Sequence, residues 1–156
     1  MIVLQRPILQ THRAAASADR LLGFALVLTG LVTLAYWVNY FTGGDVAVVR
    51  ARWYLAYESS FPAADCWLAA CALLAGAALL RGWACAGAAM LLAGSALIYL
   101  AALDITFDIE NDLYPLAARV NAMRFEIVIN AWSLTFGVLA IVAGWRRTQV
   151  SAGRDR

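Results

Sequence analysis

The sequence predicts an all-α, polytopic membrane protein, a bundle of four transmembrane helices, and two observations carry this prediction. Of the 156 residues, 63% are hydrophobic and only 14% are charged, whereas soluble domains average about 45–50% apolar and 25% charged residues. The apolar residues also fall into four uncharged blocks of near-membrane length, separated by short charged segments. An ordinary soluble enzyme is therefore excluded, and residues 1–156 are expected to form one domain inside a bilayer.

The four expected spans cover residues 21–41, 61–81, 82–104 and 126–145. At about 1.5 Å per residue, some 20 residues cross a hydrocarbon core of roughly 30 Å. The second span is expected to begin at Phe61 and Pro62, with Ser59 or Ser60 as its cap, because proline is tolerated in a first helical turn. Segments 42–60 and 105–125 are then the two outer loops.

The second and third spans follow each other with almost no connection, which predicts a tight antiparallel hairpin at Arg81 and Gly82. Small residues four apart let helix backbones approach closely in membranes. Three such pairs lie on these two spans: Ala72 with Gly76, Ala84 with Ala88, and Ala89 with Ala93. No heptad or longer internal repeat is evident, so helix packing is expected to rest on these local pairs.

Arginine placement predicts the orientation. The side that holds both termini carries eight arginines against two acids, net +6, and the opposite side carries four arginines against eight acids, net −4. Positively charged flanks stay in the cytoplasm, so the N and C termini are expected there and the acidic loops outside. All 12 basic residues are arginine, which suggests a GC-rich bacterial genome and a multi-pass protein of the bacterial cytoplasmic (inner) membrane.

Several chemistries lack the residues that they need. The three cysteines, Cys66, Cys71 and Cys85, form no CxxC pair, which excludes a thiol oxidoreductase of the vitamin K epoxide reductase type. A single histidine, His12, argues against haem and zinc sites. The basic residues are dispersed at the ends of the spans, so no nucleic-acid partner is expected. We expect no cofactor and no metal.

One acidic series invites comparison with a known family. Asp104, Asp108 and Asp112 are spaced by four, which resembles the DxxxDxxxD arrangement of UbiA-type membrane prenyltransferases. The resemblance implies binding of magnesium and a diphosphate. Those enzymes carry two Asp-rich motifs on a larger helical bundle, whereas this chain has one motif. Magnesium at the series therefore stays an open alternative.

Polar side chains gather near the outer ends of all four spans. Asp104 and Asp108 lie one helical turn apart, and Glu126, Asn130 and Ser133 form a stripe with spacing i, i+4, i+7. The first two spans and the segment between them add further groups to this layer: Tyr36, Asn39, Tyr40, Glu58 and Asp65. Lipid-facing carboxylates cost a few kcal/mol each, so these groups are expected to share an outer vestibule.

The vestibule suggests acid and base roles. The candidate catalytic residues are Asp65 and Glu126, as acid and base, with Asp104 and Asp108 tuning them. The candidate substrate-binding residues are Tyr36, Asn39, Tyr40, Glu58, Asn130 and Ser133. A structural alternative is that Asp104, Asp108 and Glu126 pair with Arg119 and Arg124 and hold the outer loop in place.

The outer segment 45–57 alternates apolar and charged residues and contains Trp53, Tyr54 and Tyr57. This pattern predicts a short amphipathic element that lies along the outer interface, anchored by its aromatic rings. A role as a re-entrant element or lid is the alternative.

The leading functional hypothesis is a small, cofactor-independent membrane enzyme. It would use its outer-leaflet carboxylates for acid/base isomerisation, cyclisation or hydration of a lipophilic, isoprenoid- or sterol-like molecule. The second hypothesis is a non-catalytic accessory subunit, partnered by a larger membrane complex or by a second copy of the chain. The third is a cation or solute transporter, which is disfavoured because the cytoplasmic end lacks acids that match those of the outer end. Membrane lipids are partners under all three.

Overall fold

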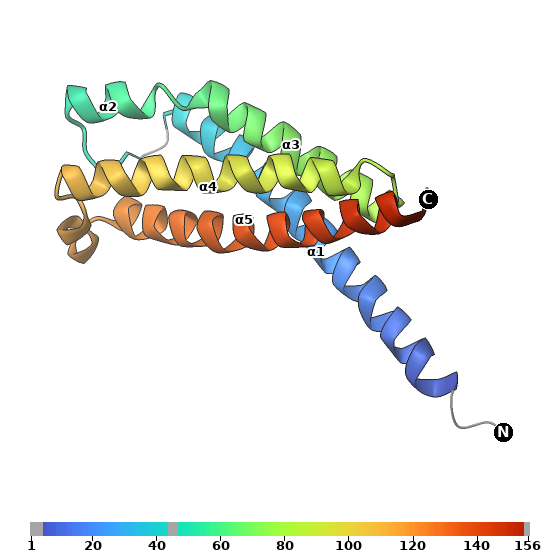
Figure 1. Cartoon of the computed structure of the whole chain (residues 1–156). Coiled ribbons are helices and arrows are strands. Elements are labelled where there is room, and N and C mark those ends of the chain that lie inside the picture. The colour runs from blue at the N-terminus through green and yellow to red at the C-terminus, as the bar shows by residue number, and fades with distance from the viewer. Residues whose placement is uncertain (1–4, 44–46, 155–156) are drawn as a thin grey trace.

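The computed structural model describes residues 5–43 and 47–154, and side chains within 16–43 and 47–149, as an all-helical bundle (Figure 1). The elements are α1 (Gln5–Phe41), α2 (Arg52–Glu58), α3 (Pro62–Arg81), α4 (Ala86–Glu110), the short 3-10 helix η1 (Tyr114–Ala118) and α5 (Asn121–Arg154). Four stretches of the described chain are long and apolar enough to span a membrane, namely Ala16–Phe41, Arg52–Arg81, Ala86–Glu110 and Asn121–Gln149. The prediction of an all-α, four-helix, multi-pass membrane protein is confirmed.

The helix bounds differ from those of the spans that hydropathy outlines. α4 begins at Ala86 rather than at residue 82 and continues to Glu110, while α5 begins at Asn121 rather than at residue 126. Hydropathy marks where the chain becomes apolar, but helical hydrogen bonds continue into polar surroundings. Asp104 and Asp108 therefore lie on one continuous helix. Several charged residues counted for the orientation lie outside the described side chains: Arg6, Arg13, Asp45, Arg154, Asp155 and Arg156.

The turn between α3 and α4 lies where the sequence predicts it. Gly82 follows the last residue of α3 with a left-handed backbone, φ 69°, which glycine adopts without a steric penalty. The N–H of Trp83 donates to the Ala78 carbonyl at 2.8 Å and closes the end of the helix. The chain thereby reverses within four residues, and α3 and α4 run antiparallel.

The predicted serine cap of α3 is wrong. Phe61 occupies the N-cap position and makes no side-chain cap bond, with Pro62 as the first helical residue. The hydroxyls of Ser59 and Ser60 instead donate backwards to the carbonyls of Ala56 and Tyr57, at 3.1 and 2.6 Å. The physical reason is that α2 ends at Glu58, and its last carbonyls need donors.

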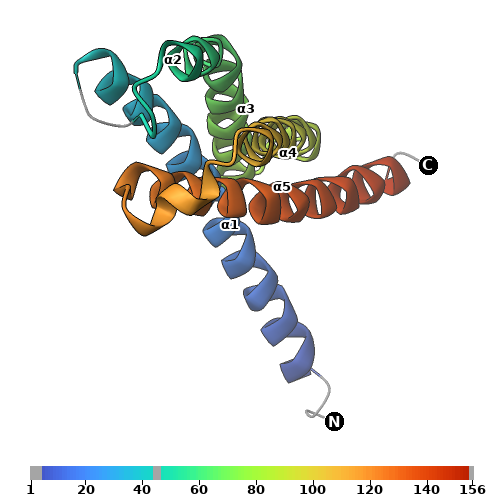
Figure 2. The same cartoon turned by 90° about the vertical axis from the view of Figure 1, so that its left-hand side faces the viewer.

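The long helices pack as a row in the order α1, α3, α4, α5. The backbones meet at glycines in two of the three contacts. A Cβ added to Gly76 of α3 would lie 2.7 Å from the Gly23 carbonyl of α1, and one added to Gly94 of α4 would lie 2.7 Å from the Gly137 carbonyl of α5. α1 and α5 are the ends of the row, and they splay apart toward the α2 end of the bundle (Figures 1 and 2).

A repeat that we did not find in the sequence underlies these contacts. Small residues recur seven apart on every long helix, as Gly23 and Gly30, Ala69 and Gly76, Gly87 and Gly94, and Gly137 and Gly144. Seven residues are close to two helical turns, so each pair lies on one face. Of the four-residue pairs expected to pack, Ala72 with Gly76 and Ala89 with Ala93 are buried, but Ala84 and Ala88 are exposed.

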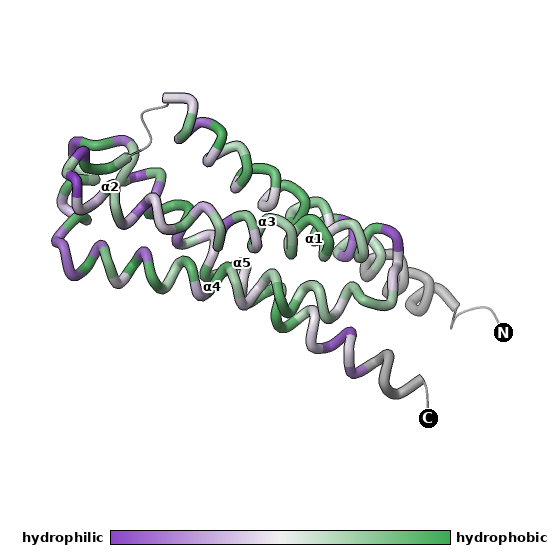
Figure 3. Tube along the Cα trace, turned by 90° about the horizontal axis from the view of Figure 1, so that it is seen from above, coloured by the Kyte–Doolittle hydropathy of each residue, from purple (hydrophilic) through white to green (hydrophobic). Residues whose placement is uncertain are grey.

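Polar and apolar residues are separated along the bundle. Figure 3 shows hydrophobic residues along the middle of the long helices and hydrophilic ones toward the ends. One end holds the start of α1, the end of α5 and the α3–α4 turn, and the other holds α2 and η1 (Figure 1). The central core includes Leu26, Met90, Leu97 and Phe136, while a second cluster of Val48, Tyr54, Leu113 and Met123 closes the α2 end.

We expect Gly94→Val to lower the free energy of unfolding by about 1–3 kcal/mol, because the added side chain would separate α4 from the α5 backbone. Ala88→Val, on the exposed face of the same helix, is the matched control. Thermal unfolding in detergent, followed by circular dichroism, measures both. Equal midpoints for the two variants would contradict this account of the packing.

Candidate functional site

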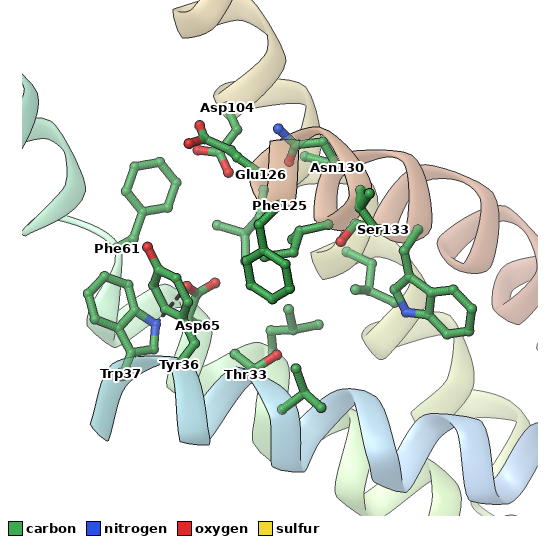
Figure 4. A pocket seen from close by; sticks show the side chains of 18 of the residues that line it. Thr33, Tyr36, Trp37, Phe61, Asp65, Asp104, Phe125, Glu126, Asn130 and Ser133 are labelled. Carbon is green, nitrogen blue, oxygen red and sulfur yellow. Dashed lines mark hydrogen bonds between the residues drawn. The ribbon is translucent and has the colours of Figure 1, made fainter. Parts of the chain in front are cut away.

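A cavity of about 640 Å³ lies at the α2 end of the bundle and receives side chains from α1, α2, α3, α4 and α5 (Figure 4). This volume falls within the range of about 300–1,000 Å³ typical of small-molecule sites. The lining is mostly apolar and includes Leu68, Leu97 and Leu100, while the carboxyl groups come from α2 and from the ends of α3, α4 and α5 nearest to it. The cavity thus has an apolar trunk and a polar head.

Four carboxyl groups line the head of the cavity, and each accepts a hydrogen bond from an aromatic side chain. The four bonds are Tyr36 Oη to Glu58 Oε1 (3.0 Å), Trp37 Nε1 to Asp65 Oδ2 (2.7 Å), Tyr57 Oη to Asp104 Oδ1 (3.2 Å) and Tyr54 Oη to Glu126 Oε2 (3.1 Å). Every donor is neutral. These bonds orient the carboxyl groups without neutralising them.

The alternative that these acids pair with loop arginines is wrong. Arg124 donates instead to the carbonyls of Ala117 and Ala118 and to the side chain of Asn121, while Arg119 is exposed. Across the described side chains, no arginine lies within ion-pair distance of the acids around the cavity. The backbone of η1 supplies the carbonyls that occupy Arg124. Among the described side chains, none therefore forms an ion pair with these acids.

Three buried side chains carry polar atoms without a hydrogen-bond partner. They are Glu58 at Oε2, Asn130 at Nδ2 and Asp108 at both carboxyl oxygens. Glu58 and Asn130 line the cavity, whereas Asp108 is fully buried beside Glu126 and outside the lining. The negative field of this cluster reaches η1, where burial and the charges of Asp108 and Glu126 raise the pKa of the Tyr114 phenol.

The structure brings most of the predicted site residues to this one cavity. Those that line it are Tyr36, Asn39, Glu58, Asp65, Asp104, Glu126, Asn130 and Ser133. Asp108 and Tyr40 do not line it. The ring of Tyr40 packs instead against Trp37 and Phe41, with centroids 5.1 and 5.4 Å away.

Sequence reasoning missed the tyrosines of α2. It placed Tyr54 and Tyr57 along the outer interface as anchors, but Tyr54 is only 1% exposed and both rings point their hydroxyls at cavity acids. α2 therefore covers the head of the cavity. The signal was present in the spacing, because Tyr54, Tyr57 and Glu58 share one helical face at i, i+3 and i+4.

The cavity opens sideways between α1 and α5, in the outer half of the bundle. Val32 of α1 and Phe125 and Val128 of α5 line it and are exposed. At the inner limit of the opening, Trp132 Nε1 donates to Thr29 Oγ1 at 3.2 Å and joins the two helices. These residues lie within the stretches that are long and apolar enough to span a membrane.

The described residues contain no group of three or more His, Cys, Asp or Glu side chains that could hold a metal ion. The series Asp104, Asp108 and Asp112 does not converge, because Asp108 is buried and Asp112 is exposed in the turn after α4. Comparison with protein-family models, curated proteins and solved structures finds no match to the chain. The site must therefore be interpreted from its own geometry.

We expect Tyr54→Phe to lower the free energy of unfolding by about 1–3 kcal/mol, because Glu126 would lose its donor in a buried setting. Thermal unfolding in detergent measures the effect. The control is Tyr99→Phe, since the Tyr99 side chain is 64% exposed on α4. If both variants unfolded at the wild-type midpoint, the hydrogen bond between Tyr54 and Glu126 would contribute nothing to stability.

Proposed function

We propose that the protein is a small integral membrane enzyme that performs acid/base isomerisation, cyclisation or hydration of a lipophilic molecule of isoprenoid or sterol type. One observation carries the proposal, namely a cavity with an apolar trunk, a lateral opening toward lipid and four carboxyl groups at its head. An apolar substrate dissolved in the bilayer could enter between α1 and α5. Its reactive double bond or epoxide would then meet the carboxyl groups.

Asp65 and Glu126 are the proposed acid and base. They come from different helices, α3 and α5, and face the cavity from separate walls (Figure 4). One carboxylic acid would protonate a double bond and leave a carbocation, and the other carboxylate would remove a proton from a neighbouring carbon. The product is an isomer, and the pair ends with its proton moved from one carboxyl to the other. Proton exchange with water then restores the starting protonation states of the two carboxyl groups.

The other groups of the head support this chemistry. The rings of Tyr36, Phe61 and Phe125 line the cavity and could stabilise a carbocation through their faces. Asp104 in the lining and Asp108 behind Glu126 place further carboxyl groups close by, and like charges at short range favour keeping one of them protonated. An acid and a base can then coexist in one site.

We place the enzyme in a bacterial cytoplasmic membrane, with both termini in the cytoplasm and the cavity in the outer leaflet. The excess of arginine at the end of the bundle that holds the termini supports this orientation. Substrate would then come from the outer leaflet.

Solvent exchange tests the reaction. Purified protein is incubated in deuterated water with squalene, squalene epoxide or geranylgeraniol, and mass spectrometry measures carbon-bound deuterium. We expect the wild type to introduce deuterium into at least one of them. Asp65→Asn and Glu126→Gln should each slow it by about a hundredfold or more, the usual contribution of a positioned acid or base.

Glu110→Gln, at the exposed end of α4, is the matched control and should exchange at the wild-type rate. Full activity in all of Asp65→Asn, Asp104→Asn and Glu126→Gln would overturn the proposal. Absence of exchange together with a stoichiometric protein partner after gentle purification would favour the accessory subunit instead.

Reporter fusions test the orientation. We expect green fluorescent protein fused to the C-terminus to fluoresce, because it folds in the cytoplasm. Alkaline phosphatase fused after Asn111 should be active, because that turn lies outside. The opposite pattern, an active phosphatase at the C-terminus and an inactive one after Asn111, would reverse the assignment.

A further inference from the structure

The four carboxyl groups at the head of the cavity have no ion-pair partner among the described side chains. These groups belong to Glu58, Asp65, Asp104 and Glu126, and each accepts a hydrogen bond from a neutral tyrosine or tryptophan donor. Within the described side chains no arginine lies within ion-pair distance of them. Isolated carboxylates are costly inside a membrane, where such groups normally have a partner. A ligand that brings positive charge would supply this partner.

A buried, unpartnered oxygen marks the position. Glu58 lines the cavity and is 9% exposed, its Oε1 accepts the Tyr36 hydroxyl, and its Oε2 is buried without a hydrogen-bond partner. Buried polar atoms are nearly always hydrogen-bonded in folded proteins. Oε2 can only accept when the group is ionised, so the missing partner is a donor. A second lining residue, Asn130 of α5, is 3% exposed, and its amide nitrogen also has no hydrogen-bond partner.

Aromatic rings surround the same position. Tyr36 and Trp37 are in edge contact at 5.3 Å between centroids, and Tyr57 and Phe61 are in edge contact at 4.8 Å. All four line the cavity. Faces of such rings attract cations, and sets of them recognise organic ammonium groups. A bare metal ion would find no group of three donor side chains within the described residues, so an organic cation fits the site better.

We propose that the cavity binds an amphiphilic primary ammonium compound, with its charged head beside Glu58 and Asp65 and its alkyl tail among Leu68, Leu97 and Leu100. The ammonium group donates to the Glu58 carboxyl group. The tail reaches the trunk through the opening between α1 and α5. This inference goes beyond the proposed function, because binding of the cation requires no turnover.

Native mass spectrometry of the full chain, released from the uncharged detergent dodecyl maltoside, tests the proposal. The probes are dodecylamine, which is protonated at neutral pH, and 1-dodecanol, which differs from it only in an uncharged head. We expect a saturable one-to-one adduct with dodecylamine and binding of 1-dodecanol at least about tenfold weaker. Glu58→Gln should weaken dodecylamine binding by about tenfold or more, as loss of a desolvated charge pair does.

The control variant Glu110→Gln has the same net charge as Glu58→Gln, but the substituted residue is exposed and outside the cavity. It should bind dodecylamine as the wild type does. Circular dichroism and monodispersity check folding, and Asp104→Asn replaces Glu58→Gln if that variant does not fold. Equal binding of the two probes, or equal binding by the carboxyl-to-amide variant and the control, would overturn the proposal. Displacement of dodecylamine by equimolar sodium or magnesium would also overturn it, in favour of an inorganic cation site. None of these outcomes depends on deuterium exchange, so binding and catalysis can fail separately.

Discussion

Close backbone contact at glycines is the constraint on which the rest of this structure depends. α1 meets α3 at Gly23 and Gly76, and α4 meets α5 at Gly94 and Gly137. Helices in lipid gain little from hydrophobic burial against each other and associate through close packing instead. The two tight pairs, joined through α3 and α4, leave α1 and α5 as the ends of a row. Their separation toward the α2 end creates the cavity and its opening.

The polar chemistry of the cavity follows from how the four helices and α2 end. The acids come from the outer ends of α3, α4 and α5 and from α2, and the donors come from α1 and α2. Neutral aromatic donors hold each carboxyl group in place but supply no charge. Ion pairs with arginine would have given the same residues a structural role, namely to hold the loop between α4 and α5 in place. Their absence among the described side chains around the cavity leaves the carboxyl groups free to act on a ligand.

Much of the fold could be predicted because apolar blocks and charged flanks are local properties of the chain. The acids at 65, 104 and 126 could be placed at one depth for the same reason. Depth along a helix says nothing of rotation about its axis, however. The sequence placed Asp108 and Tyr40 at the same depth as the other site residues, but neither lines the cavity. Asp108 lies beside Glu126, and the ring of Tyr40 packs against Trp37 and Phe41.

The sequence alone predicts a four-helix membrane protein in which arginines gather at the end with the termini and acids at the opposite end. The tertiary structure adds that α2 covers the head of the cavity, that Tyr54 and Tyr57 hold two of its acids, and that Arg124 binds η1 carbonyls rather than acids. These features bring together residues that are far apart in the sequence, such as Tyr54 and Glu126. Such pairings depend on the crossing and rotation of helices, which packing of the whole bundle sets and no local pattern records.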